Sequence, residues 1–362
     1  MPHFEGLSPG AGLAVAVSGG ADSLLALALA VERSRRSAAP VIGLHAHFLP
    51  PDAAAKGLAR ELGALCERLG ARFYALDLSE AFERDVIAPF VAAYRDGLTP
   101  NPCARCNALM KFGLVLDAAE GLGAARLATG HYAALRFGAG GAPRLFRGAD
   151  PRRDQSYFLA QVEASRLARA VFPLAGWRKT ETRAELARRG LAAPLPKESR
   201  EICFIPGDDY RAFLAGRGSM PGPGEAVFAD GKVAGSHLGL WRHTLGQRKG
   251  LGISHPEPLY VLAKQAKDNR LVVGVKGELA VERFRIEGLN VLSAPETWPE
   301  TIGVQTCYRQ RPRAVARIEW EDAGAALVHL REPAERPAPG QAAVFYASDE
   351  VVAGGRIADG QI

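Results

Sequence analysis

Hydrophobic and polar positions follow two different spacings in the first 130 residues. Short apolar runs that end in glycine or polar residues predict strands, and longer stretches with apolar residues at helical intervals predict helices. The expected strands are 12–18, 40–49, 72–78 and 125–133, and the expected helices are 24–36, 52–71 and 110–124. Strands separated by helices of this length predict an α/β fold, with a parallel sheet covered by helices on both faces.

The pattern changes after one more helix. Residues 179–196 have helical character, with Thr180 as the candidate N-cap and Gly190 as the stop. Beyond about Pro206, glycine and proline become frequent and short β-like runs appear. From about Leu279, short strands alternate with turns, as in a small barrel or sandwich. We therefore predict three domains, at 1–207, 208–277 and 278–362.

Composition limits the class of protein without identifying it. A chain of 362 residues with 48% hydrophobic content is large enough for two or three domains. Its formal charge of +6 permits a polyanionic partner but does not require one. The apolar stretch 13–31 contains a Gly-Gly pair, two serines and an aspartate, which argues against a membrane span, and no signal-peptide pattern opens the chain. Five cysteines are too few for a disulfide scaffold, so we expect a soluble cytoplasmic protein.

The strongest chemical signal is the glycine loop in AVAVSGGADS, residues 14–23. A strand ends at Ser18, Gly19 and Gly20 form a tight turn, and a helix begins near Asp22. Glycines let a phosphate approach the backbone, and a helix N-terminus offers unpaired N–H groups. The Lys-Ser/Thr pair of a Walker loop is missing. The loop resembles instead the pyrophosphate-binding SGGxDS loop of PP-loop ATPases, which attach AMP to a substrate oxygen; a sharp turn without a ligand is the alternative.

A second candidate for the same crevice follows the fourth expected strand, in ATGHYA. Ligands of open parallel sheets bind beyond the carboxyl ends of the strands. Gly130 and His131 are therefore expected to face the glycine loop. The alternative for His131 is a turn histidine that is bonded to backbone.

Thiols are the third signal. Cys103 and Cys106 lie three residues apart in TPNPCARCNALMKFG, residues 99–113, where two prolines argue against an ordinary helix. Cys203 lies in a distant segment, close in sequence to Lys197 and Arg200, and a nearby cation favours the thiolate, which is both the nucleophile and the metal ligand. The alternative for the pair is half of a structural zinc site, but no second C-x-x-C appears. Three cysteines leave one coordination position open, which is more typical of a reactive site.

The two remaining cysteines, Cys66 and Cys307, are expected to be small hydrophobic residues of the core.

Eight segments, in order along almost the whole chain, resemble the bacterial tRNA-specific 2-thiouridylases, which place sulfur on C2 of the wobble uridine. They are SGGADS, GLTPNPCARCNALMKFG, ATGHYA, RRDQSYFLAQV, LPKESREICFIPG, HTLGQRKGLGI, CYRQRP and PGQAAVFYASDEVVAGGRI. The resemblance implies a PP-loop (adenine nucleotide α-hydrolase-like) catalytic domain, a small β-rich central domain and a C-terminal β-barrel that contacts tRNA. It also implies a sulfurtransferase with ATP and Mg²⁺ as cofactors, and as partners the tRNA anticodon loop and a sulfur-donor protein or sulfide.

The resemblance also implies roles for individual residues. Cys203 is similar to the cysteine that carries a persulfide, and Cys106 to a partner that either releases the sulfur as sulfide or closes a disulfide afterwards. ATP binding is implied for Ala16, Val17, Ser18, Gly19, Gly20, Ala21, Asp22, Ser23 and Gly130. Contact with the target base or the rest of the tRNA is implied for Asn101, Pro102, Cys103, His131, Arg153, Asp154, Gln155, Tyr308, Arg309 and Gln341.

The chain departs from the family pattern at Cys103, where aspartate is common. A thiol is a weaker acid than a carboxyl group, so an acid/base role does not carry over simply. The change creates a three-thiolate set, Cys103, Cys106 and Cys203, with an open fourth position that suits a [4Fe–4S] cluster able to bind hydrosulfide. The persulfide and cluster routes both remain open at this point.

Two other readings of the chain compete with sulfur transfer. One is a PP-loop synthetase that uses a nitrogen nucleophile, which would have no need of the three thiols. The other is a non-catalytic RNA-binding or sulfur-carrier protein, which would have no need of an intact SGGxDS loop.

Overall fold

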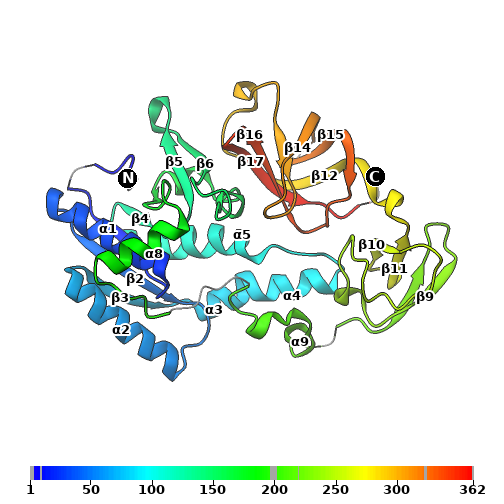
Figure 1. Cartoon of the computed structure of the whole chain (residues 1–362), viewed down its shortest axis with the longest axis horizontal. Helices are drawn as coiled ribbons and strands as arrows, with labels where there is room; N and C mark the ends of the chain where they lie inside the picture. The colour runs from blue at the N-terminus through cyan, green and yellow to red at the C-terminus, as the bar shows by residue number, and fades with distance from the viewer. Residues whose placement is uncertain (1–3, 9, 196–201, 219, 322–323, 361–362) are drawn as a thin grey trace.

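The computed structural model describes residues 4–8, 10–195, 202–218, 220–321 and 324–360. An α/β unit lies at one end of the elongated molecule and a small β-sheet unit at the other, and a barrel lies above the helices between them (Figure 1). This arrangement confirms the predicted fold class, an α/β domain followed by a small β-rich unit and a C-terminal barrel.

The N-terminal unit is built on a five-stranded sheet in which every pairing is parallel. Its strands are, in spatial order, β3 (Arg72–Asp77), β2 (Val41–His47), β1 (Leu13–Ala16), β4 (Arg126–Ala128) and β7 (Ala170–Val171). Strand β1 pairs with β2 on one side and with β4 on the other, so the strand order reverses between β1 and β4. Such a switch point opens a crevice beyond the carboxyl ends of the two strands.

Helices bury both faces of this sheet. Leu13 and Val15 of β1 pack in one core with α1 (Ala21–Ser37), α2 (Ala53–Leu69) and α8 (Lys179–Arg188). Ala14 packs in another core, with α6 (Leu116–Gly121). The alternation along β1 therefore follows the two-residue period of a strand that is buried on both sides.

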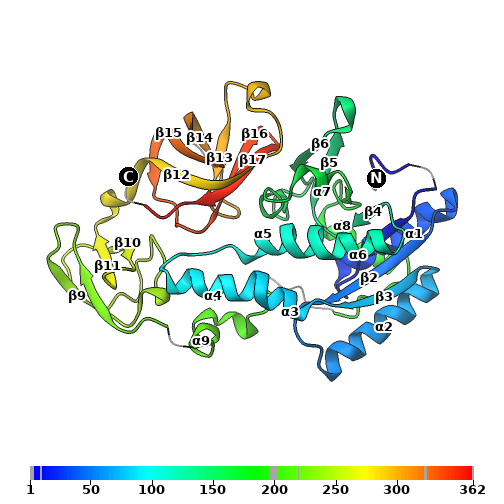
Figure 2. The ribbon, with the colours of Figure 1, turned by 180° about the vertical axis from the view of Figure 1, so that it is seen from behind.

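Two helical runs form an arm that reaches from the sheet toward the central unit and back, side by side (Figures 1 and 2). The outward run is α3 (Ser79–Phe82), η1 (Glu83–Ile87) and α4 (Ala88–Arg95), and the returning run is α5 (Pro102–Cys106), η2 (Asn107–Val115) and α6. Both η1 and η2 are π-helical.

The prolines do not exclude a helix from the stretch 99–113, although it begins only at Pro102 and becomes π-helical from Asn107. Pro102 is in the first turn of α5, where its missing N–H costs no hydrogen bond. The Asn101 side chain caps this turn by accepting a hydrogen bond from the Ala104 N–H at 3.1 Å. The prolines thus mark the start of the helix that carries both cysteines.

The central unit is a four-stranded sheet that follows α9 (Tyr210–Ala215). Its strands are, in spatial order, β10 (Tyr260–Gln265), β11 (Arg270–Gly274), β8 (Gly224–Val227) and β9 (Val233–His237). The arm contacts this unit just beyond α4. A Cβ atom on Gly97 would lie only 3.5 Å from Cβ of Lys264 in β10.

The C-terminal unit is a closed six-stranded barrel. Its strands are, in order around the barrel, β12 (Ala280–Val291), β15 (Ala325–Glu335), β14 (Arg313–Glu321), β13 (Gly303–Gln305), β16 (Ala342–Ala347) and β17 (Glu350–Ile357), and β17 pairs with β12 to close it. Strand β17 also pairs with a hairpin of the N-terminal unit, β5 (Ala133–Phe137) and β6 (Pro143–Arg147), through Val351 and Leu145. The hairpin and its pairing were not expected from the sequence.

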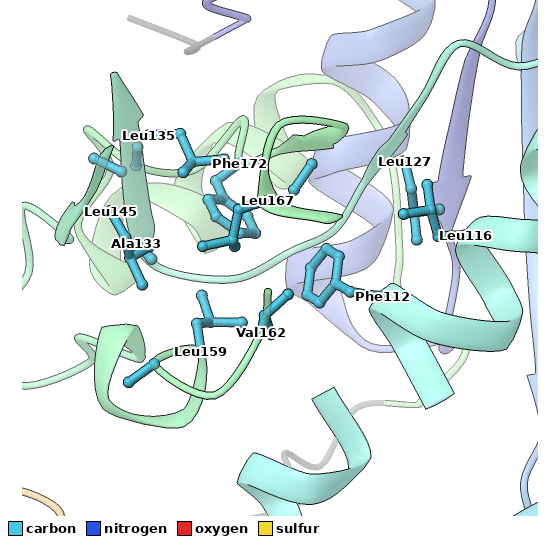
Figure 3. Close-up of a cluster of buried hydrophobic side chains, with 14 of the residues drawn as sticks. Phe112, Leu116, Leu127, Ala133, Leu135, Leu145, Leu159, Val162, Leu167 and Phe172 are labelled. Carbon is cyan, nitrogen blue, oxygen red and sulfur yellow. The ribbon is translucent and has the colours of Figure 1, made fainter. Parts of the chain in front are cut away.

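One apolar core joins the sheet to the barrel. Figure 3 shows part of this core, in which Phe112, Leu127 and Leu145 are labelled. The core contains Phe112 from η2, Leu127 from β4, Leu145 from the hairpin and Val344 from the barrel. The shared core and the strand pairing together fix the barrel over the arm.

Three details complete the fold. Helix α8 begins at Lys179 with Arg178 at the N-cap, so the predicted cap at Thr180 is wrong by two residues. None of the described helices has the length and apolarity that a membrane span requires. The short helical turns are η3 (Ala139–Gly141), η4 (Ser156–Phe158), α7 (Ala164–Leu167), η5 (Pro206–Asp208), η6 (Leu240–Arg242), η7 (Lys276–Leu279) and η8 (Pro295–Thr297).

Candidate active site

The glycine loop joins β1 to α1 and is held in shape by two serines. Gly19 has a φ of +89°, a left-handed conformation that favours glycine, and Gly20 is extended at the N-cap position of α1. The Ser23 hydroxyl accepts a hydrogen bond from the Ser18 N–H at 3.1 Å and donates one to the Gly20 carbonyl at 3.0 Å. Among the described residues no side chain caps α1, which leaves the N–H groups of its first turn available to an anion.

The turn after β4 lies directly against this loop. A Cβ atom on Gly130 would lie 2.8 Å from the carbonyl carbon of Asp22 and 2.9 Å from the backbone nitrogen of Ser23. Only glycine fits at this distance. The carboxyl ends of β1 and β4 therefore meet at one place, as expected at the switch point.

Asp22 belongs to a network that the sequence did not reveal. Lys179 Nζ donates hydrogen bonds to both carboxylate oxygens of Asp22, each at 2.6 Å, and the Tyr132 hydroxyl donates to Oδ1 at 2.7 Å. The Tyr132 hydroxyl also lies 2.8 Å from Oγ1 of Thr182 in α8. A lysine in the first turn of a helix opposes the helix dipole, and this was the available signal that Lys179 has another role.

His131 is buried between the glycine loop and the arm. Its Nδ1 lies 2.7 Å from Oγ1 of Thr129, so its partner is a hydroxyl rather than the backbone group of the alternative reading. Its ring contacts the rings of Phe112 and Phe172, with centroids 6.1 and 5.9 Å away. Burial, with a contribution from the charge of Lys111, holds the pKa of His131 well below its usual value, so the imidazole is neutral at pH 7.

The cysteine segments converge beside the arm. Cys106 is buried in the same apolar cluster as Phe204 and Ile205, the residues that follow Cys203. The Phe204 ring lies edge-on to Phe90 of α4, with centroids 5.3 Å apart. Cys203 itself is exposed, next to its buried neighbours, and all five cysteines are free thiols. The predicted meeting of the two thiol segments is consistent with this packing.

Desolvation and the charge of Lys111 affect the pKa values of all three thiols, those of Cys103, Cys106 and Cys203. Desolvation by the surrounding protein raises the pKa of the Cys103 thiol and of the Cys203 thiol, although the Cys203 residue is exposed, and burial raises that of Cys106 to about 12. The charge of Lys111 lowers all three pKa values, and the negative charge of a Cys203 thiolate raises those of Cys103 and Cys106. The net shift is upward even with Lys111 present, so each thiol is protonated at neutral pH.

Lys197 and Arg200, the cations expected from the sequence to favour the Cys203 thiolate, lie outside the described residues. Lys111 was missed, although a single lysine within the apolar run ALMKFGLVL was a visible signal.

The three thiols are the candidate donor set for an iron–sulfur cluster. Within the described part of the chain, no three side chains of His, Cys, Asp or Glu are arranged to hold a metal ion. Cys103, Cys106 and Cys203 thus do not form a ready cluster site in this conformation, and no chemical step is derived through a cluster.

The predicted tRNA residues 153–155 form a turn beside β5 and β6. The buried Asp154 carboxylate accepts a hydrogen bond from Arg147 at 2.8 Å and three more from neighbouring backbone and hydroxyl groups. The Gln155 side chain accepts a hydrogen bond from the Tyr132 N–H at 3.0 Å. Arg153 is half-buried. As placed, Asp154 and Gln155 support the turn that carries Tyr132, and direct contact with tRNA stays a prediction for all three.

Two loops of the barrel approach the base-binding segment that was predicted from the sequence. Tyr308 packs on Phe158 with centroids 4.6 Å apart, and the exposed Arg309 lies over the Tyr308 ring at 5.1 Å. Gln341 Nε2 lies 3.5 Å from the carbonyl oxygen of Pro100, one residue before Asn101. The structure thus brings Gln341 next to Pro100, directly before the segment of Asn101, Pro102 and Cys103.

The remaining cysteines differ. Cys66 is fully buried, and burial raises its pKa to about 11, which confirms the expected core position. Cys307 is exposed in the turn after β13, so the core assignment of this residue is wrong.

The fold and the loop define a class of protein first. A parallel sheet in the order β3-β2-β1-β4-β7, with an SGGxDS loop at the switch point, is the arrangement of a PP-loop nucleotide-binding enzyme. Three family models match consecutive parts of the chain, namely the tRNA methyl transferase HUP domain at 11–207, the tRNA methyl transferase PRC-barrel domain at 211–275 and the aminomethyltransferase beta-barrel domain at 281–357.

Curated relatives specify the family. The chain is 54% identical over 352 residues to the tRNA-specific 2-thiouridylase MnmA of Nitratidesulfovibrio vulgaris (strain Miyazaki F), covering 95% of this chain and 98% of the relative. It is 51% identical over 356 residues to the protein of the same name from Oleidesulfovibrio alaskensis, covering 96% and 99%. The one from Lawsonia intracellularis is 42% identical over 350 residues, covering 95% and 98%. The chain belongs to the tRNA-specific 2-thiouridylase family, a family of tRNA sulfurtransferases, which confirms the resemblance.

Proposed function

We propose that this protein replaces the C2 oxygen of the wobble uridine of tRNA with sulfur, at the expense of ATP. The observation that carries the proposal is the packing of Cys106 with the residues that follow Cys203, on the same arm whose Phe112 ring contacts His131. His131 directly follows Gly130, which touches the glycine loop. The nucleotide loop and the thiols therefore border one region.

The first step is adenylation. The C2 carbonyl of uridine is a poor electrophile, and its oxygen becomes a leaving group when it attacks the α-phosphorus of ATP and pyrophosphate departs. The loop residues 16–23 and Gly130 are proposed to hold the phosphates through backbone N–H groups and the start of α1. We expect Mg²⁺ to enter with the phosphates of ATP and to screen their charge, since the Asp22 carboxylate is already bonded to Lys179.

The second step is sulfur transfer. The terminal sulfur of a Cys203 persulfide attacks C2, the C2–O bond breaks, and AMP leaves with the oxygen. The Cys106 thiolate then attacks Sγ of Cys203, which leaves sulfur on C2 and joins the two cysteines in a disulfide. Electrons balance because the transferred sulfur is reduced as the two cysteines are oxidised. A persulfide-carrying donor must reload Cys203 and a thiol reductant must reopen the disulfide, both of which we expect in the cytoplasm.

The tRNA is proposed to lie between the arm and the barrel. Its anticodon loop would meet Asn101, Pro102, Cys103 and His131, and its backbone would meet residues 153–155, Tyr308, Arg309 and Gln341. The wobble base has to leave its stack to reach the crevice, so part of the binding free energy offsets unstacking.

A reconstitution tests the function. Purified protein, ATP, Mg²⁺, a persulfide donor and unmodified tRNA are incubated, and the tRNA is digested and analysed by mass spectrometry. We expect 2-thiouridine at the wobble position and one AMP per sulfur. A methylated or aminated uridine would contradict the proposal, as would ATP turnover that is independent of tRNA.

Single substitutions separate the two steps. Cys203→Ser should abolish thiolation while tRNA-dependent release of pyrophosphate persists, whereas Cys307→Ser, a change to an exposed thiol, should leave both unchanged. A synthetase that used a nitrogen nucleophile would tolerate Cys203→Ser. Iron that copurifies under anaerobic conditions and is required for thiolation would favour the [4Fe–4S] route over the persulfide route.

A further inference from the structure

Asn107 lies on the returning run of the arm, where α5 passes into η2. Its N–H bonds to the Cys103 carbonyl, four residues back, so the chain between these two residues is α-helical. Residues four apart in an α-helix lie on the same face, one turn from each other. The side chains of Cys103 and Asn107 therefore share one face of the arm, and Cys103 is a predicted contact of the target base.

The amide of Asn107 is held from one end only. The residue is buried, with 3% of its surface exposed, and its Nδ2 donates a hydrogen bond to the Phe158 carbonyl at 3.0 Å. Because a carbonyl oxygen can only accept, this bond fixes which end of the amide faces Phe158 and leaves Oδ1 as an acceptor on the other side. Among the described residues, no group donates a hydrogen bond to Oδ1.

An acceptor that is buried without a donor costs free energy, and native proteins rarely contain one. Of the other buried side-chain atoms that lack a partner in the described ranges, only Thr99 Oγ1 lies in the same stretch, 99–107. This stretch includes Asn101, Pro102 and Cys103, the predicted base-binding segment. An unpartnered acceptor at this place points to a donor that arrives with the substrate.

Aromatic side chains next to Asn107 suit a nucleobase. Phe158, whose carbonyl holds the Asn107 amide, packs its ring on that of Tyr308 with centroids 4.6 Å apart. Both aromatic residues are half-buried, and partly open aromatic faces stack unpaired RNA bases. Asn107 thus neighbours an aromatic pair through Phe158 and the base-binding segment through Cys103.

We propose that Asn107 is a specificity-determining residue for the target base, whose Oδ1 accepts a hydrogen bond from N3–H of the extruded uracil. Uracil carries a proton on N3, whereas cytosine has a lone pair there, so the same oxygen attracts uracil and repels cytosine. N3 is bonded to C2, so a contact at N3 holds the reacting carbon near Cys103 and leaves the C2 oxygen open to ATP. The inference rests on the proposed function for the identity of the base.

The contact forms only on binding. Because Asn107 is buried in the free protein, the side chains that cover Oδ1 have to move aside when the base enters, as side chains at binding sites commonly do. The amide itself stays in place, since the Phe158 carbonyl holds its other end. An acceptor that is already oriented costs little conformational entropy when the base binds.

Two unmodified tRNAs that differ only at the wobble position, one with uridine and one with cytidine, test the proposal. Their dissociation constants and the rates of tRNA-dependent pyrophosphate release are measured with the complete protein. We expect the unaltered protein to favour the uridine tRNA by at least about tenfold in both measurements. Asn107→Ala should lower affinity and rate for the uridine tRNA by about tenfold without lowering those for the cytidine tRNA, so that the preference disappears.

Asn290→Ala is the matched control. Asn290 in β12 also donates from Nδ2 to backbone carbonyls of the segment 158–162, at 2.8 and 2.9 Å. If Asn107 only supported this segment, the two substitutions would weaken the binding of both tRNAs alike. The proposal is overturned if Asn107→Ala keeps the preference for uridine, or if Asn290→Ala removes it equally.

A substrate measurement covers the case in which Asn107→Ala does not fold. A tRNA with 3-methyluridine at the wobble position has no N3–H, and the unaltered protein should bind it no better than the cytidine tRNA. Binding as tight as that of the uridine tRNA would overturn the proposal.

The proposed function is tested separately. If Asn107→Ala loses the preference in binding but the unaltered protein forms no 2-thiouridine, the role of Asn107 stands and the proposed function is wrong. If the unaltered protein forms 2-thiouridine and Asn107→Ala keeps the preference, the function stands and the role of Asn107 is wrong.

Discussion

Gly130 touches Asp22: a Cβ atom on the glycine would lie 2.8 Å from the aspartate carbonyl carbon. The turn that leads to His131 is thereby seated on the first turn of α1, where the phosphates of ATP are proposed to bind. The nucleotide loop and the His131 side of the thiol region are connected through this contact.

Gly130→Ala should therefore impair the use of ATP. The new methyl group can be accommodated only if backbone moves, because the nearest atoms are backbone atoms of Asp22 and Ser23. We expect kcat/KM for ATP, measured as tRNA-dependent pyrophosphate release, to fall by at least about tenfold, a loss of about 1.4 kcal/mol. Gly121→Ala is the control, since a Cβ atom there meets nothing within 4 Å, and equal effects of the two changes would refute the reasoning.

The ion pair of Asp22 and Lys179 should couple α1 to α8. Lys179 is largely buried, so its removal leaves the carboxylate with fewer partners. A double-mutant cycle with Asp22→Asn and Lys179→Met, read by urea unfolding, should give a coupling free energy of about 1–3 kcal/mol. The exposed pair of Arg36 and Glu32 should give less than about 0.5 kcal/mol. Similar values for the two pairs would show that the network does not stabilise the loop.

His131 should make the protein sensitive to acid. Its pKa is lowered in the folded state, so the unfolded chain binds a proton near pH 6.5 that the folded protein does not. This contribution to stability is present above pH 6.5 and is lost as the pH falls. When the pH falls from 7 to 5.5, the unfolding free energy of the His131→Asn protein should decrease by about 1 kcal/mol less than that of the unaltered protein. The control is His255→Asn, a change to an exposed histidine, which should leave the pH dependence of the unfolding free energy unchanged. The assignment would be contradicted if His131→Asn showed the same pH dependence as the unaltered protein.

Sequence patterns predicted the fold well where local chemistry decides structure. Alternating strand and helix patterns gave the α/β sheet, and the SGGxDS loop marked the turn that Gly19 requires. Long-range consequences were out of reach. The pairing of β6 with β17 depends on where the barrel docks, and Pro102 was misjudged because its position in a first turn depends on the Asn101 cap.

The charged members of the site were the hardest to predict. Lys179 bonds to Asp22 although the two residues are more than a hundred positions apart in the chain, and the arm contains two π-helical segments. No periodicity in the sequence predicts a π-helical turn, because the stability of such a turn comes from the packing around it. The core assignment of Cys307 was wrong because the short strand β13 ends at Gln305, so that Cys307 lies in the turn that follows the strand.

The contact of the barrel with the arm should matter for tRNA rather than ATP. Gly340 has a φ of +92°, and a Cβ atom there would lie 3.1 Å from Cβ of Leu98 and from the Thr99 nitrogen. Gly340→Ala should strain this contact by about 1–3 kcal/mol and raise KM for tRNA several-fold, with KM for ATP unchanged. Gly277→Ala, in open space, is the control. A rise in KM for ATP alone would contradict the placement of the tRNA.

The central claim is that the thiols of Cys106 and Cys203 reach one another, and peptide mapping after mild oxidation with diamide tests it most directly. The account predicts that the peptide of Cys203 is recovered in a disulfide with that of Cys106, while Cys66 and Cys307 remain free thiols. Recovery of Cys203 joined to Cys307 or to a second molecule, with Cys106 still reduced, would contradict it.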